Sequence, residues 1–352
     1  MTTLTTVPVT TSCKPIANYD RPLWQRMFMT REMAIIALFL AVVVVAALIV
    51  PNFDSKMTMT YLLLDMFPIL IIALPMTAII VTGEIDLSVA SVVGLSSVLT
   101  GVLTQAGVPF GLTILLAIVA GVLAGAFNGF LVTVVGLPSL AVTIGTLALY
   151  RGLAVGLLGT TAVTDFPEFW TSLAKAKIGD TGIPVVVILF VVLAIAFAVM
   201  LHLTRFGRGV FALGLSPEAA RFSGVNVERT KFLLFVFCGA VSALAGVYYT
   251  LRYGSARGDN ATGMEMQVIA AVLLGGVSIF GGRGALHGVI AGVLLIGVLG
   301  SALRLANVTS DVINIITGVL LIAAVISSSV FAAFRNRRRS GRPLKLAGSA
   351  KP

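Results

Sequence analysis

Two carboxylates, Glu84 and Asp86, lie two residues apart in the stretch TAIIVTGEIDLSVASVVGL, which is otherwise almost wholly apolar. An acidic side chain is costly in a membrane and rare in a protein core, so it needs a partner, water or a function there. One interpretation is that either acid titrates in an ion pathway. The other is that Asp86 and Ser88 cap a helix beginning at Leu87 by accepting hydrogen bonds from its free N–H groups. The strong preference of aspartate for the N-cap favours the second interpretation, with Glu84 facing the helix break or water.

Further polar side chains fall at or near the depth of the membrane helices that we predict below. They are Asn128, Thr143, Thr146, Arg151, Glu265, Gln267 and Asn314. Ionisable groups at such depth indicate a transport pathway or a buried pair. The candidates for a helix break or a pathway are Glu84, Asp86, Ser88, Glu265 and Gln267.

The composition indicates an all-α polytopic membrane protein. The chain of 352 residues is 58% hydrophobic and 11% charged, against about 25% charged residues in an ordinary globular domain. Apolar runs long enough to span a bilayer recur along a transmembrane domain, residues 32–334, and we expect about ten helices. Their predicted ranges are 33–50, 59–82, 85–105, 112–135, 139–158, 184–203, 230–251, 265–281, 285–303 and 310–334.

The distribution of positive charge predicts the orientation. Lysines and arginines number four in the N-terminal tail (1–31), five in the loop 204–231 and seven in the basic C-terminal tail (335–352). With ten helices these segments share one side, whereas the loops on the other side hold six. Because cytosolic loops carry the excess of lysine and arginine, both termini are expected in the cytosol. The net charge of +10 has the same origin, and since basic patches occur only at membrane edges, nucleic acid is not an expected partner.

Two glycine motifs suggest an internal repeat. GVLAG at 121–125 and GVIAG at 288–292 are small-xxx-small faces, and each opens a predicted helix pair. They hint at two five-helix repeats, which must be inverted in the membrane because five is an odd number. The alternative is that such motifs are simply frequent in membrane helices.

The polar loop between the sixth and seventh predicted spans carries helix signals. Ser216 suits the N-cap, Pro217 suits the first turn, and Glu218 complements the helix dipole. Gly224 is placed to end the helix, which is predicted to run from Pro217 to Ser223 on the cytosolic surface. The helix is either an ordinary connector that carries cytosolic charges or a docking surface for a partner.

Motifs for common enzymatic chemistries are absent from the sequence. There is no Walker A motif for nucleotide phosphates, and no metalloprotease or serine-hydrolase motif. The histidines, His202 and His287, lie in different predicted helices, and Cys13 and Cys238 lie in a tail and in a span. We therefore predict no catalytic site, no metal site and no cofactor, and a membrane-embedded enzyme is poorly supported.

Several segments, in the right order, resemble the ribose-type permeases of bacterial ABC sugar importers. Their GGIDLSVGS segment is matched by GEIDLSVASVVGL, their coupling segment by SPEAARFSGVNVERTKF, and their glycine-rich run by EMQVIAAVLLGGVSIFGGRGALHGV. PNF after the first span also matches, so the resemblance covers about residues 33–330. Within this family the chain looks most similar to the permeases for rhamnose and for autoinducer-2. The stretch RYGSARGDNATGMEM is similar to a segment of the autoinducer-2 permeases. The chain departs from the pattern at Glu84 and Ala90, where glycine is usual, and at Gln267, where an acid is usual.

The resemblance implies a permease subunit that carries a sugar or sugar-like solute, such as rhamnose, a ribose-type pentose or autoinducer-2, into the cytoplasm. The implied partners are two ABC ATPase subunits, a second permease that is identical or paralogous, and an extracytoplasmic substrate-binding protein. The implied location is the lipid bilayer of the bacterial inner membrane. Contacts with the ATPase would be made by Ser216, Pro217, Glu218, Ala219, Ala220, Arg221 and Gly224. An ion-coupled secondary transporter, in which Glu84 or Asp86 titrates, is the alternative.

Overall fold

The computed structural model describes residues 31–309, 311–320 and 322. Within these residues the chain is helical, with two isolated β-bridges and no strand, so the predicted all-α architecture is confirmed. The helices are α2 (Arg31–Ile49), α3 (Lys56–Val81), α4 (Val89–Gln105), α5 (Phe110–Thr133), α6 (Ser139–Leu158), α7 (Glu168–Lys175), α8 (Val186–Leu203), α9 (Arg205–Leu215), α10 (Pro217–Phe222), α11 (Val227–Tyr253), α12 (Met264–Leu274), α13 (Leu286–Leu305) and a further helix, Asp311–Leu320. A 3-10 turn, η1, covers Gly179–Thr181. The predicted tails lie outside the described residues, apart from Arg31, which begins α2.

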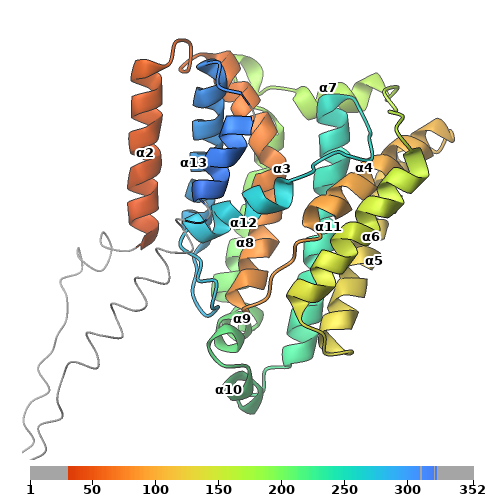
Figure 1. Ribbon diagram of the computed structural model, residues 1–352, viewed down its shortest axis with the longest axis vertical. Coiled ribbons are helices and arrows are strands. Elements are labelled where there is room, and N and C mark those ends of the chain that lie inside the picture. Colours follow the sequence, from red (N-terminus) through yellow and green to blue (C-terminus); the bar gives the residue numbers. More distant parts are fainter. Residues whose placement is uncertain (1–30, 310, 321, 323–352) are drawn as a thin grey trace, which may run out of the picture.

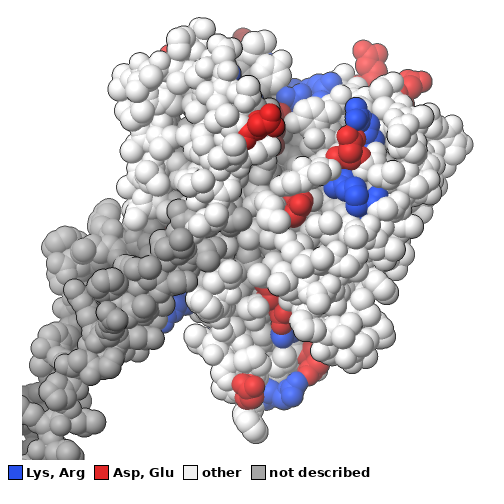
Figure 2. Space-filling view, viewed as in Figure 1, with Lys and Arg blue, Asp and Glu red and all other residues white. Residues whose placement is uncertain are grey.

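The long helices stand side by side, and their connections define two ends of the bundle (Figure 1). The α7 end, residues 159–185, lies at the top of the view, and the α10 end, residues 204–226, lies at the bottom. Most of the surface in Figure 2 is uncharged, and its charged side chains gather toward the upper, α7 end and at the lower, α10 end. The loops predicted to be cytosolic and external thus fall at opposite ends. Which end faces the cytosol stays a prediction.

Seven described helices are long and apolar enough to cross a membrane, namely α2, α3, α5, α6, α8, α11 and α13. Three shorter apolar helices, α4, α12 and Asp311–Leu320, fall in the remaining predicted spans. Helix α12 ends at Leu274 instead of residue 281, and Gly276 beyond it adopts a left-handed φ of 94°. The count of ten stays a prediction, because the last predicted range extends beyond the described residues.

Helix α3 occupies the interior of the bundle, and 94% of its most hydropathic window is buried. It packs against α8, α11, α12 and α13, and α11 also lies along α4 and α5. A helix that is apolar all round is typical of such a buried position. The sequence of α3 meets this condition, since its single charged residue in the interior, Asp65, is paired with Arg252 of α11 at 3.0 Å.

Glycines allow the closest helix contacts. A Cβ on Gly239 of α11 would lie only 2.2 Å from the carbonyl oxygen of Gly121 on α5. In the second motif, a Cβ on Gly288 of α13 would lie 2.2 Å from the carbonyl oxygen of Gly275, directly after α12. Both motifs are therefore helix-packing faces. The arrangement as two inverted repeats stays a prediction.

The sequence did not predict α7 or α9. Two arginines and three glycines in α9 disfavour a helix by hydropathy and by propensity. The Thr204 side chain nevertheless caps it by accepting a hydrogen bond from the Gly207 amide. Val210 and Leu213 are fully buried on one face, so packing stabilises the helix despite its composition.

Candidate functional site

The start of α10 agrees with the sequence-based prediction. The Ser216 hydroxyl accepts a hydrogen bond from the Ala219 amide at 3.2 Å, which satisfies one free N–H group of the helix. Pro217 occupies the first turn, and Gly224 follows the helix with a φ of 82°, a conformation that glycine adopts without strain. The Ser216 hydroxyl also bonds to the Glu218 carboxylate at 3.1 Å. These local contacts give α10 a fixed start and a sharp exit.

The two alanines of α10 face in opposite directions. Ala219 is exposed, whereas Ala220 is only 1% exposed and packs against Leu213 and Val227. The prediction that both alanines offer close approach to a partner is therefore wrong for Ala220, which anchors α10 to α9 and α11. The role of Ala219 in docking stays a prediction.

Sequence reasoning missed two apolar residues at the same surface. Phe222, the last residue of α10, is 95% exposed, and Leu215 at the end of α9 is 70% exposed. The available signal was an aromatic side chain, Phe222, at the end of the predicted surface helix. Exposed aromatic residues are typical anchors of protein interfaces. Together Leu215, Ala219 and Phe222 make an exposed surface that we term the α10 tip.

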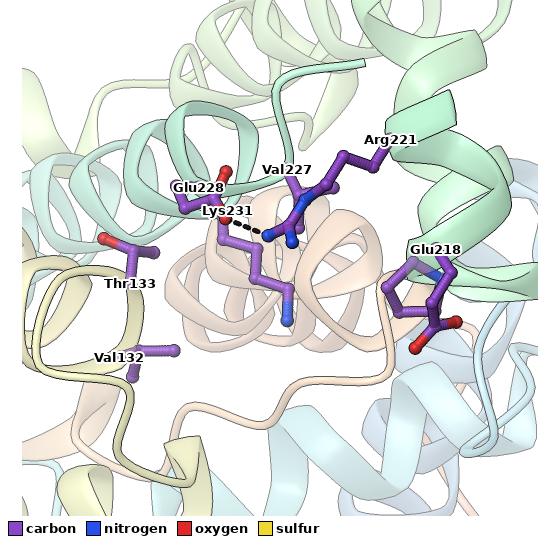
Figure 3. A pocket seen from close by; sticks show the side chains of 8 residues that line it. Val132, Thr133, Glu218, Arg221, Val227, Glu228 and Lys231 are labelled. Carbon is purple, nitrogen blue, oxygen red and sulfur yellow. Dashed lines mark hydrogen bonds and ion pairs between the residues drawn. The ribbon is translucent and has the colours of Figure 1, made fainter. Parts of the chain in front are cut away.

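A charged pocket of about 240 Å³ lies between α10, the start of α11 and the end of α5 (Figure 3). Arg221 of α10 forms an ion pair with Glu228 of α11, and this pair is solvent-exposed. The Lys231 side chain points into the pocket, and its ammonium group pairs with Glu84. The Glu84 and Lys231 side chains are only 15% and 19% exposed, so this second pair is largely shielded from water. The pocket thus connects α10 to the helix break at Glu84.

The helix break is a non-helical segment, residues 83–88, between α3 and α4. Helix α4 begins at Val89, so the prediction that Asp86 caps a helix starting at Leu87 is wrong in register. The Asp86 carboxylate instead accepts hydrogen bonds from the Ser88 amide at 2.9 Å and the Ser88 hydroxyl at 2.7 Å. Asp86 therefore stabilises the bend that leads into α4, because it bonds twice to Ser88, the residue before the helix.

Polar side chains from three helices converge on this bend. The Asn128 amide of α5 donates to the Ser88 hydroxyl at 2.8 Å, and the Tyr150 hydroxyl of α6 donates to the Asn128 carbonyl at 3.3 Å. The thiol of Cys238 on α11 lies next to the Asp86 carboxyl. All five side chains are buried, and we term them the Asp86 cluster. Glu84 lies outside the cluster, at its margin with the charged pocket.

The remaining candidates lie elsewhere. Glu265 and Gln267 are half-buried in the first turn of α12, a helix that contacts α4. Arg151 of α6 lies between the start of α4 and the start of α12. It donates to the Ala90 carbonyl of α4 at 3.2 Å and, at 2.8 Å each, to the carbonyls of Gly258 and Asn260 ahead of α12. Arg151 therefore holds the starts of α4 and α12 near one another.

The described residues contain no group of three or more histidine, cysteine, aspartate or glutamate side chains that could hold a metal ion. The polar groups of the site are instead ion pairs and hydrogen bonds within the protein, set among apolar helices. Such an arrangement is typical of a membrane transport pathway, where intramembrane polar groups line a route or hold a moving element.

Comparison with known proteins identifies the family. The family described as "Branched-chain amino acid transport system / permease component" matches residues 58–325. The chain belongs to this permease family. The membership confirms the predicted resemblance to importer permeases and the multi-pass location in the membrane.

Three similar relatives carry the name "Autoinducer 2 import system permease protein LsrD". The relative from Escherichia coli O157:H7 is 38% identical over 305 residues, which cover 85% of this chain and 92% of that protein. The relatives from Escherichia coli strain K12 and Shigella flexneri are 37% identical over the same extent. No solved structure matches the chain.

Proposed function

We propose that this permease is the membrane-spanning subunit of an ATP-binding-cassette importer for autoinducer-2 or a similar sugar-like solute. The substrate class is supported by the relatives named as autoinducer 2 import permeases. Coupling to an ATPase is supported by one structural observation, the capped helix α10 with an exposed tip at one end of the bundle.

The tip has the properties that a mechanical contact requires. Its start is fixed by the Ser216 cap, and Ala220 holds it against α9 and α11. Phe222 offers a large apolar side chain that is 95% exposed. A closing ATPase that engaged this helix would move α9 and α11 with it. The five lysines and arginines of residues 204–231 support a cytosolic position for this end.

ATP would be hydrolysed by two partner subunits, since the sequence has no Walker A motif. A second permease, identical or paralogous, would complete the pathway, and a substrate-binding protein would deliver the solute at the α7 end. We assign no catalytic role and no cofactor to this chain.

The route of the solute would pass the starts of α4 and α12. Transporters commonly place interrupted helices near the middle of the membrane, next to the substrate. Here α4 follows the non-helical segment 83–88, and α12 follows a non-helical segment after Gly254. Asp86 and Ser88 on one side, and Glu265 and Gln267 on the other, are the polar residues nearest to these starts in sequence.

Asp86 keeps the ion-coupled alternative open to experiment. Its side chain is 2% exposed, and among the described residues no basic side chain is bonded to it. Uptake into proteoliposomes that hold the permease, its ATPase and its binding protein distinguishes the two functions. We expect uptake that requires ATP hydrolysis and survives the collapse of proton and sodium gradients. Uptake that follows a gradient without ATP would refute the proposal.

Docking of the ATPase can be tested at the tip. Changing Ala219→Asp together with Phe222→Asp places two charges on exposed positions, so the chain should accumulate normally in the membrane. We expect the variant to lose co-purification with the ATPase. Phe169→Asp is a matched control, because Phe169 is 69% exposed on α7 at the opposite end of the bundle. Wild-type co-purification of the tip variant would show that α10 is an ordinary connector.

A further inference from the structure

The chain on both sides of α10 touches the helix break. Ahead of α10, Gly214 of α9 lies against the last residue of α3, and a Cβ on Gly214 would lie 1.8 Å from the Val81 carbonyl oxygen. After α10, Lys231 of α11 forms its ion pair with Glu84. Any displacement of α10 relative to the bundle therefore acts on residues 81–84 through a backbone contact and an ion pair.

The Gly214–Val81 contact and the Glu84–Lys231 ion pair differ in how easily they can break. The Gly214–Val81 contact is made by backbone atoms of two packed helices, so it is fixed. The Glu84–Lys231 pair is made by two side chains with rotatable bonds, and it can break when α11 moves. Both groups are more than four-fifths shielded from water, which strengthens their attraction compared with the exposed pair Arg221–Glu228.

The segment held by Glu84 contributes Asp86 and Ser88 to the Asp86 cluster. Ile85, directly after Glu84, is tied to α6: its amide donates to the Ser139 hydroxyl at 3.3 Å, and its carbonyl accepts from Thr143 at 3.2 Å. These are single neutral hydrogen bonds at or beyond the usual length. Ser88 of the same segment also accepts a 2.8 Å hydrogen bond from Asn128 of α5. The Glu84–Lys231 pair is the one salt bridge, among the described residues, that fastens this segment to α11.

We propose that the Glu84–Lys231 ion pair is a latch that holds segment 83–88 against α11, with Asp86 and Ser88 seated in the Asp86 cluster, and that it releases the segment when α10 moves. Glu84 and Lys231 are positioning residues for transport and do not contact the solute. The latch rests on the proposed function only in naming the ATPase as the source of the movement. Closure itself is a property of this chain and can be measured without any partner.

The chain carries its own reporter of closure. Cys238 is fully buried next to Asp86, and the only other cysteine in the sequence is Cys13. In a Cys13→Ser background, a small water-soluble thiol reagent can therefore report the opening of the segment by the rate at which it labels Cys238. The full chain in lipid nanodiscs, without ATPase, is sufficient for this measurement.

Breaking the latch is expected to expose Cys238. Glu84→Gln and Lys231→Met should each raise the labelling rate about tenfold, since a shift of 1.4 kcal/mol changes the opening equilibrium tenfold. The exchange of both residues, Glu84→Lys with Lys231→Glu, should return the rate toward that of the parent. Glu228→Gln is the matched control, because it removes an exposed ion pair from the same pocket and should leave labelling unchanged.

The outcomes separate a latch from a structural ion pair. Labelling that stays at the parent rate in both single variants would overturn the proposal, and so would single variants that fail to accumulate as folded protein. Labelling that rises in both singles but not in the exchange supports it, whatever the transport assay shows. With ATPase and binding protein present, the single variants should hydrolyse ATP while moving less solute per ATP, which tests the link to the proposed function separately.

Discussion

Alanine at Gly239 is expected to force α5 and α11 apart. Its Cβ would lie 2.2 Å from the Gly121 carbonyl oxygen and 2.8 Å from the Gly125 amide nitrogen, whereas ordinary van der Waals contact begins at 3.4 Å. Both neighbours are backbone atoms of a membrane helix, so no side chain can rotate away. The two helices must therefore separate by about 1 Å, and overpacking of this kind costs about 1–3 kcal/mol.

The effect can be measured as a lower melting temperature of the purified chain, read from the fraction that stays monodisperse after heating. We expect Gly239→Ala to melt several degrees below the parent and Gly239→Leu to melt lower still. The matched control is Gly145→Ala on α6, where no atom lies within 4 Å of the added Cβ. That change removes a glycine from a helix and should stabilise the chain or leave it unchanged.

The reasoning would be refuted if Gly239→Ala melted at the temperature of the parent. Equal losses at Gly239 and Gly145 would also refute it, because a general intolerance of helix glycines would then replace the specific contact between α5 and α11.

Two further predictions concern the ends of the bundle. Reporter fusions at residue 345 should behave as cytosolic and fusions at residue 170 as external, because the basic residues favour a cytosolic α10 end, and a cytosolic signal at 170 would contradict the topology. The pKa of the Glu218 carboxyl lies below its ordinary value because its own backbone amide and then the Ser216 hydroxyl donate hydrogen bonds to it. The charged form thus stabilises the start of α10 above the ordinary pKa of glutamate, and this contribution is lost as the pH falls through the lowered value. Hydrogen exchange of the α10 amides, corrected for the intrinsic rate, should rise on acidification in the parent but not in Glu218→Gln, and equal profiles would exclude the effect.

Sequence patterns predicted correctly those features that depend only on neighbouring residues. Hydropathy located the long helices, and the run Ser216-Pro217-Glu218 located the start of α10 because a cap needs only neighbouring residues. The same local rules gave a wrong prediction for the helix cap at Asp86. Ser88 also suits the N-cap, and the bend places the Asp86 carboxylate on the Ser88 amide, so the helix starts two residues later than predicted.

Contacts between distant residues could not be predicted in this way. Glu84 and Lys231 are 147 positions apart, and neither residue type identifies the other as its partner. The inward position of Ala220 also depends on packing with Leu213 and Val227, and α9, which supplies Leu213, was itself missed. Both features follow from how α9, α10 and α11 sit on the bundle, which no single stretch of the sequence encodes.

The interior position of α3 has a consequence for biogenesis. It is the second of the described helices to leave the ribosome, yet it packs against α8, α11, α12 and α13, all of which are synthesised later. Until then α3 must rest in lipid, or in a chaperone or insertase, on the surfaces that it will finally bury. Its apolar character, with a mean hydropathy of 2.3, stabilises α3 in lipid before its partner helices are synthesised as well as in the final core. A polar substitution on α3, such as Ile72→Asn, is therefore expected to be detected by quality control during insertion, before the folded permease exists to be destabilised.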